Sequence, residues 1–150
     1  MKRQPSASIV VLVAIGGAIG AMLRHGCSLA STMLGGGEVA WLMFVNLAGS
    51  FALGLVFASL DPEAPRPRDV EQSLDALDPD PRKDRIGAFL AVGLIGTFTT
   101  YSSLALLLAE RFEAGQIFEG SLLLGVSLVG GMGMVASGVK IGRWRVIRSG

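Results

Sequence analysis

Four long apolar segments constrain this chain more than any other feature. They cover roughly residues 7–30, 39–60, 86–109 and 120–139. A helix needs about 20 mostly apolar residues to cross a bilayer, and each segment has that length. With 51% hydrophobic residues and a mean hydropathy of +0.56, the chain is too apolar for an ordinary soluble domain. We therefore predict an all-α membrane protein, with a single four-helix domain over residues 1–150 and a mobile linker at residues 61–85.

The basic residues gather at one end of this predicted bundle. Four spans place both termini and the 61–85 linker on the same side of the membrane. Eleven of the 13 Lys and Arg residues lie on that side: Lys2, Arg3, Arg66, Arg68, Arg82, Lys83, Arg85, Lys140, Arg143, Arg145 and Arg148. Because loops rich in Lys and Arg stay in the cytoplasm, we expect a multi-pass protein of the cell membrane with both termini cytoplasmic. The bias also predicts one strongly preferred orientation in the surrounding lipid.

The third apolar segment contains an unusual polar stretch, GLIGTFTTYSS at residues 93–103. Glycine weakens a helix, and Ser and Thr side chains can replace the backbone hydrogen bonds that a broken turn releases. Non-helical backbone at membrane depth is tolerated only where protein or a water-filled cavity surrounds it. Broken helices near the midplane are also where transport proteins hold ions. The stretch therefore predicts that the third helix breaks at Gly96–Thr99 and that the other helices enclose the break.

Three further polar residues in the spans each allow two interpretations. Arg24 either extends to the membrane interface or places a fixed positive charge at the mouth of an anion path. Asn46 is an amide that must be paired in the membrane, so it either joins two helices or donates into a pore. Ser127 either bonds its own backbone one turn earlier or belongs to a polar track. The residues alone leave these alternatives open.

Three motifs taken together resemble the Fluc (CrcB) family of fluoride channels. They are GGAIGAMLR at residues 16–24, VNLAGSF at residues 45–51 and the GLIGTFTTYSS stretch itself. The resemblance covers all four spans in order, although the 61–85 linker is longer than the family pattern. It implies a dual-topology dimer of antiparallel four-helix subunits, with two fluoride pores and a central structural sodium ion. The implied function is passive fluoride efflux, which lowers fluoride toxicity.

The resemblance also implies roles for individual residues. Asn46, Tyr101, Ser102 and Ser127 match positions that line the fluoride pore, and Arg24 matches an arginine at the end of the first helix. The backbone carbonyls of Gly96 and Thr99 match those that hold sodium. A hard cation suits such oxygen ligands. Since one chain offers two carbonyls, two chains meeting at the break would offer four.

Several positions depart from the family pattern. Tyr101 and Leu104 stand where two pore phenylalanines are expected, and three more leucines replace polar residues of the pattern, at Leu42, Leu107 and Leu123. An aromatic ring edge can face an anion, whereas leucine cannot. Together with the strong orientation bias, these departures predict an antiparallel heterodimer with a second, oppositely inserted homologous subunit.

Two other functions remain as alternatives. A non-conducting structural subunit of such a channel would also explain the lost pore residues. A small four-helix drug exporter would need a carboxylate inside the membrane for proton coupling, and the first three predicted spans contain no Asp or Glu. An enzyme is not expected, because His25 is the single histidine and no nucleophile–base pairing or metal-ligand spacing is present. Nothing in the sequence indicates binding to nucleic acid.

Overall fold

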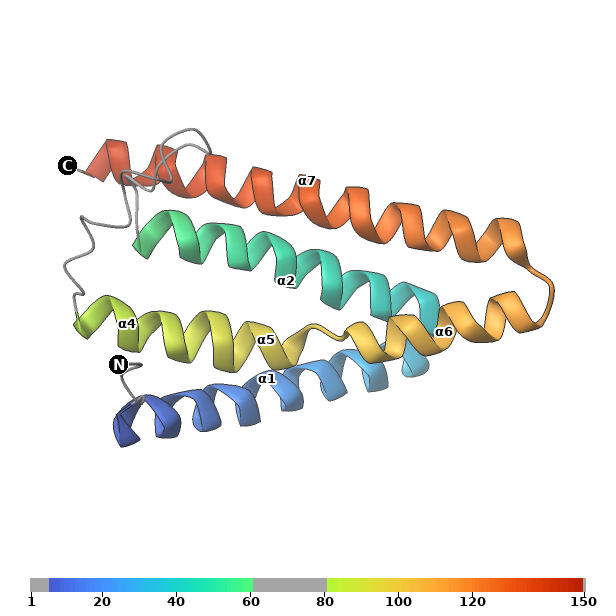
Figure 1. Cartoon of the computed structure of the whole chain (residues 1–150), viewed down its shortest axis with the longest axis horizontal. Coiled ribbons are helices and arrows are strands. Elements are labelled where there is room, and N and C mark those ends of the chain that lie inside the picture. Colours follow the sequence, from blue (N-terminus) through green and yellow to red (C-terminus); the bar gives the residue numbers. More distant parts are fainter. Residues whose placement is uncertain (1–5, 61–80, 150) are drawn as a thin grey trace, which may run out of the picture.

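The fold is described by a computed structural model that covers residues 6–60 and 81–149, with side chains to Trp144. Every regular element in this part of the chain is helical. The elements are α1 (Ala7–Met33), α2 (Glu38–Leu60), α4 (Pro81–Gly87), the π-helix η1 (Ala88–Ile95), α5 (Gly96–Phe98), α6 (Tyr101–Glu113) and α7 (Ile117–Ser149). Figure 1 shows α4 through α6 following one another end to end, so that together they form the third of four rods.

The prediction of a four-span, all-α membrane protein is confirmed. Four helical stretches are long and apolar enough to cross a membrane: residues 7–33, 38–60, 81–113 and 117–144. The third begins at Pro81 and therefore takes five residues from the predicted linker. The rest of that linker, residues 61–80, lies outside the described residues. The observed helices are longer than predicted because a helix keeps its backbone paired beyond the apolar region, where hydropathy no longer marks it.

Both described ends of the chain lie at the same end of the bundle (Figure 1). At the opposite end, short turns join α1 to α2 and α6 to α7. Gly35 and Gly115 lie in these turns with φ values of 70° and 75°, a left-handed conformation that glycine adopts without steric cost. The short turns make the joined helices antiparallel neighbours.

The helices pack by close backbone approach. The two most extensive contacts are those of α2 with α7 and of α1 with η1. In the first, Gly138 lies against the backbone of α2 around Gly54, and a Cβ at Gly138 would collide with the Phe51 carbonyl oxygen. In the second, Gly16 lies against Gly93 in the same way. Small residues at such contacts are typical of helix packing in lipid.

The predicted break in the third helix is confirmed, but it lies further along the chain than the sequence indicated. Gly96–Phe98 is helical, and the extended residues are Thr99 (φ −75°, ψ 157°) and Thr100 (φ −144°, ψ 116°). The expectation of a break at Gly96–Thr99 assumed that glycine would end the helix. Instead, Gly96 keeps helical angles, and hydrogen bonds from another helix fix the break at Thr100.

Candidate functional site

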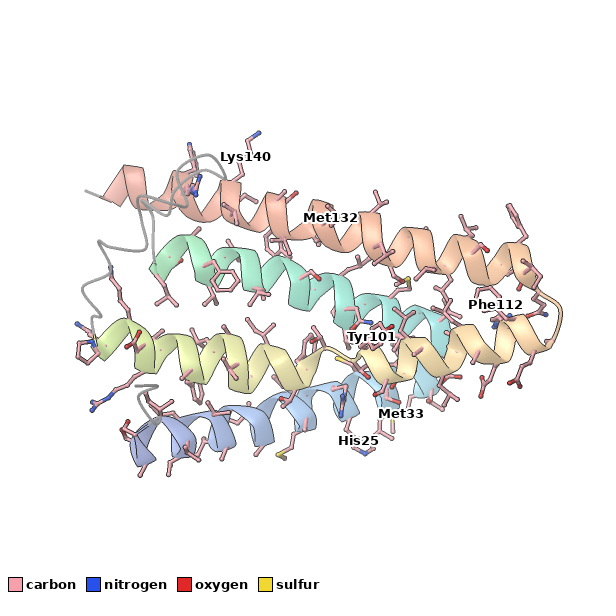
Figure 2. The ribbon with its side chains drawn as sticks, in the orientation of Figure 1. His25, Met33, Tyr101, Phe112, Met132 and Lys140 are labelled. Atoms are coloured by element: carbon pink, nitrogen blue, oxygen red, sulfur yellow. The ribbon has the colours of Figure 1, made fainter. Side chains whose placement is uncertain are left out.

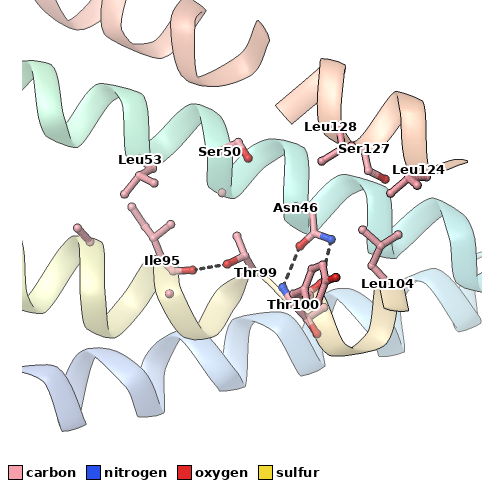
Figure 3. A pocket seen from close by; sticks show the side chains of 14 residues that line it. Asn46, Ser50, Leu53, Ile95, Thr99, Thr100, Leu104, Leu124, Ser127 and Leu128 are labelled. Atoms are coloured by element: carbon pink, nitrogen blue, oxygen red, sulfur yellow. Dashed lines mark hydrogen bonds between the residues drawn. The ribbon is translucent and has the colours of Figure 1, made fainter. Parts of the chain in front are cut away.

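A central cavity of about 310 Å³ opens beside the break in the third helix (Figure 3). Residues of α2, of the segments before and after the break, and of α7 line it. These are Asn46, Gly49, Ser50, Leu53, Ala91, Ile95, Gly96, Thr99, Thr100, Tyr101, Leu104, Leu124, Ser127 and Leu128. The lining combines amide, hydroxyl and backbone groups with apolar side chains and contains no carboxylate or basic group. It can therefore offer hydrogen bonds to an ion without placing a fixed charge against it.

Asn46, on the neighbouring helix α2, stabilises the break through two hydrogen bonds. Its Oδ1 accepts a hydrogen bond from the Thr100 backbone N–H at 2.8 Å, and its Nδ2 donates to the Thr100 carbonyl at 3.1 Å (Figure 3). This arrangement fits the interpretation in which Asn46 joins two helices. An amide nitrogen carries two hydrogens, so the second remains for a ligand in the cavity.

Thr100 also begins the helix that follows the break. The residue is 4% exposed, and its Oγ1 accepts a hydrogen bond from the Ser103 backbone N–H at 3.2 Å. This is the normal bond of an N-cap residue, which satisfies one of the unpaired donors at a helix start. The same hydroxyl lies 3.0 Å from Ser103 Oγ and 3.3 Å from Ser102 Oγ. The sequence analysis did not single out Thr100, although its place before a Ser-rich helix start is a typical cap signal.

Because of these bonds, two backbone carbonyls near the break lose the N–H donors that they would have in a continuous helix. In an α-helix the N–H of Thr100 would bond the Gly96 carbonyl, and that of Ser103 would bond the Thr99 carbonyl. Here the first donates to Asn46 and the second to the Thr100 hydroxyl. The carbonyls of Gly96 and Thr99 are thereby released from α-helical pairing. Both residues line the central cavity.

Thr97 ties the segment before the break to α1. Its Oγ1 lies 2.9 Å from the carbonyl oxygens of Gly17 and of Gly93, and 3.3 Å from that of Leu94. The Gly17 contact fixes the segment against α1, where a Cβ at Gly20 would collide with the Thr97 hydroxyl. The sequence analysis missed this role, because only the fold brings residues 17 and 97 together.

Some of the other residues predicted from the sequence line the cavity, and others do not. Tyr101 lines it and is 82% exposed; it is labelled beside the break in Figure 2. Ser127 lines it from α7, and its Oγ donates to the Leu123 carbonyl at 2.7 Å, the bond to its own backbone that was one of its two interpretations. Ser102 is exposed and is not among the residues that line the cavity, although its Oγ lies 3.3 Å from the Thr100 hydroxyl. Arg24 is half-buried on α1 and is not among the described residues that line the cavity.

The described part of the chain holds no group of three or more His, Cys, Asp or Glu side chains that could bind a metal ion. The residues that line the central cavity carry backbone carbonyl and hydroxyl oxygens. Such oxygens suit hard cations.

We predict that Thr100→Val destabilises the start of α6, just after the break, more than Thr100→Ser does. Valine keeps the size of threonine but loses the hydroxyl that accepts the Ser103 N–H. Loss of an N-cap acceptor costs about 1 kcal/mol, so Thr100→Val should lower the thermal midpoint by a few degrees. Thr100→Ser keeps the acceptor and serves as the control. Equal midpoints for Thr100→Val and Thr100→Ser would show that the cap is not needed.

Comparison with known proteins identifies a single family. The model of the family described as "CrcB-like protein, Camphor Resistance (CrcB)" matches residues 11–139. A protein of Hyphomonas neptunium named fluoride-specific ion channel FluC is 36% identical over 139 residues, which cover 92% of this chain and 94% of that protein. Proteins of the same name from Allorhizobium ampelinum and Thermus thermophilus are each 34% identical, covering 90% and 88% of this chain and 96% and 93% of their own lengths.

Proposed function

The chain belongs to the CrcB family, and on this premise we propose that it is a subunit of a fluoride-specific ion channel. The subunit would let fluoride leave the cytoplasm by passive flow across the cell membrane. The observation that carries the proposal is the central cavity, where Asn46, the broken third helix and Ser127 converge at the middle of a four-span bundle. The related proteins that bear the channel name span nearly the whole chain, which supports the same function.

The chemistry of the cavity suits a small halide. An ion taken from water into a low-dielectric interior costs much free energy unless polar groups replace its hydration. Asn46 offers the second hydrogen of its amide, and Ser102 offers a hydroxyl. Ser127 would offer its hydroxyl in exchange for the bond that it makes to the Leu123 carbonyl. The Tyr101 ring offers an electropositive edge. Several weak donors in series allow an ion both to enter and to leave. We assign these four residues to the fluoride path and place Arg24 at its approach, where a positive charge attracts anions.

We further propose that the carbonyls of Gly96 and Thr99 hold a structural sodium ion. The fit rests on the diverted hydrogen bonds, which release these two carbonyls beside the cavity. Two oxygens are too few for a hard cation, so a second chain would supply the rest across a dimer interface. The bound ion would supply a fixed positive charge that joins the two broken helices.

If sodium joins the subunits, the purified dimer should melt at a higher temperature in sodium than in N-methylglucamine at equal ionic strength. A ligand at about 100 times its Kd stabilises the folded state by about 2.7 kcal/mol. The measurement is thermal unfolding together with the oligomeric state at each temperature. Thr100→Ser should keep this sodium dependence, because it keeps the break. Identical melting in both cations would contradict the assignment.

The assembly that fits best is an antiparallel dimer with a second homologous subunit. The strong charge bias favours one orientation for this chain, with both termini cytoplasmic. Tyr101, which projects from the break at 82% exposure, is placed to contact such a partner. Such a dimer can be made by co-expression with a CrcB homologue whose charge bias predicts the opposite insertion. We call this dimer the paired assembly.

A non-conducting structural subunit is the second candidate. It is favoured by the burial of Leu104 and Leu107, which are 7% and 4% exposed at positions where the family pattern has pore groups. In this case the chain would complete the dimer while its homologue carried the ion path.

Fluoride efflux from proteoliposomes that hold the paired assembly tests the proposal. A channel passes fluoride down its gradient with no proton gradient and leaves an equal chloride gradient intact. Flux that requires a proton gradient would identify an exporter instead. An intact paired assembly that never passes fluoride faster than protein-free liposomes would reject the channel.

A further inference from the structure

A second cavity lies in the same groove between α2, α6 and α7, nearer to the α6–α7 turn. This hairpin cavity has a volume of about 330 Å³ and is lined by Val39, Met43, Arg111, Glu119, Leu122, Leu123 and Val126. Its charged rim is formed by Arg111, which pairs with Glu119 at 3.1 Å and donates to Gln116 Oε1 at 3.0 Å. The central cavity at the break therefore has a polar lining, and the hairpin cavity near the turn has a polar rim.

A cluster of buried leucines adjoins both cavities. Leu42, Leu104 and Leu107 form one cluster and are 0%, 7% and 4% exposed; we call them the leucine cluster. Leu104 also lines the central cavity, whereas Val39 and Leu123 pack against the cluster and line the hairpin cavity. The cluster therefore adjoins both cavities.

On the α7 side, a residue that lines the central cavity contacts one that lines the hairpin cavity. Ser127 faces the central cavity, and its Oγ lies 3.8 Å from the sulfur of Met43, which lines the hairpin cavity. The hydroxyl already donates to the Leu123 carbonyl, and a thioether is a weak acceptor. Among the described residues that line the two cavities, the next strong hydrogen-bond donor beyond Ser127 is Arg111.

We infer that the leucine cluster is a dry barrier that separates the two cavities and limits fluoride passage along this groove. Apolar constrictions stop ions because water and its dissolved ions leave them, and fluoride would have to cross this one without donors. The part that concerns fluoride rests on the proposed function, whereas the dryness of the cluster does not. The paired assembly would then conduct mainly along the partner's groove, with this subunit's own groove as the slow path.

Cysteine accessibility tests the dryness directly. In a Cys27→Ser background, Leu107→Cys should react with a charged, water-soluble thiosulfonate at least about tenfold more slowly than Ser127→Cys, because reaction needs a hydrated thiolate. Full reaction after denaturation in detergent shows that the thiol is intact. Adding Leu104→Ser should make Cys at 107 reactive by admitting water. The matched control is Leu106→Ser, since Leu106 is 61% exposed and is not among the described residues that form the cluster or pack against it.

Fluoride efflux from the paired assembly provides the second readout. Leu107→Gln should raise efflux about twofold or more, because an opened groove adds a path beside the one that conducts, whereas Leu106→Gln should leave it unchanged. Rapid labelling of Leu107→Cys in the folded protein would overturn the barrier whatever the efflux. Unchanged efflux with Leu107→Gln, although Leu104→Ser admits the reagent, would overturn the claim that the cluster limits fluoride. Slow labelling with no efflux from any assembly would uphold the dry cluster and reject the proposed channel function.

Discussion

Replacing Asn46 with leucine is expected to reduce fluoride efflux by about 100-fold. The change removes both hydrogen bonds that Asn46 makes to Thr100 and leaves a buried N–H and a buried carbonyl unpaired. Each unpaired group costs about 1–3 kcal/mol, and each 1.4 kcal/mol is a factor of ten in an equilibrium. The population with a correctly formed break should fall accordingly. With it fall the positions of Tyr101 and of the Gly96 and Thr99 carbonyls at the proposed dimer interface, on which the partner's groove also depends. The measurement is fluoride efflux from the paired assembly.

Ser59→Leu is the matched control for Asn46→Leu. Ser59 lies on the same helix and is exposed, and within the described part of the chain its hydroxyl bonds its own backbone, at the Leu55 carbonyl. The same change from a polar residue to leucine there should leave efflux unaltered. If Asn46→Leu formed a stable paired assembly that passed fluoride at the unmodified rate, the coupling of Asn46 to the break would have no role in conduction.

The second large effect is expected at the contact between α2 and α7. A Cβ at Gly138 would meet the Phe51 carbonyl oxygen and lie 3.0 Å from the Leu55 nitrogen. These are backbone atoms, so the two helices must separate to admit even alanine. Overpacking of this kind costs about 1–3 kcal/mol, and each kcal/mol lowers the melting temperature by about 2–4 °C in a domain of this size. Gly138→Ala should therefore lower the melting temperature by several degrees, as measured by thermal unfolding in detergent.

Gly133→Ala on the same helix isolates the effect of the contact. Apart from its chain neighbours and the nearby backbone of its own helix, no atom of the described residues lies within 4 Å of a Cβ built at Gly133. Alanine favours a helix by up to about 1 kcal/mol over glycine, so the melting temperature should stay the same or rise. Equal losses at both positions would mean that the Gly138 contact does not hold α2 against α7.

The number and order of the spans could be predicted because hydrophobicity over about 20 residues depends little on tertiary structure. The polar stretch at residues 93–103 likewise indicated a broken helix. Its exact register could not be predicted, since the break is fixed by Asn46, a residue 54 positions away from Thr100. Glycine alone does not end a helix whose other bonds are intact, as the helical angles at Gly96 show.

The sequence indicated which residues belong to the candidate site better than it indicated which atoms those residues contact. Five of the residues chosen from sequence line one cavity: Asn46, Gly96, Thr99, Tyr101 and Ser127. Thr97 and Thr100 were not chosen, because their roles depend on atoms of other helices. The leucines that depart from the family pattern were noted one by one. Only the fold shows that Leu42, Leu104 and Leu107 form one cluster and that Leu123 packs against it.

The central claim is that this chain forms a fluoride channel together with an oppositely inserted homologue. The most direct test is fluoride efflux, measured with a fluoride electrode, from proteoliposomes that contain the chain alone or the paired assembly at equal protein mass. We expect slow efflux from the chain alone and rapid, chloride-insensitive efflux from the paired assembly. Rapid efflux from the chain alone would contradict the need for a second subunit, and no efflux from either preparation would contradict the channel itself.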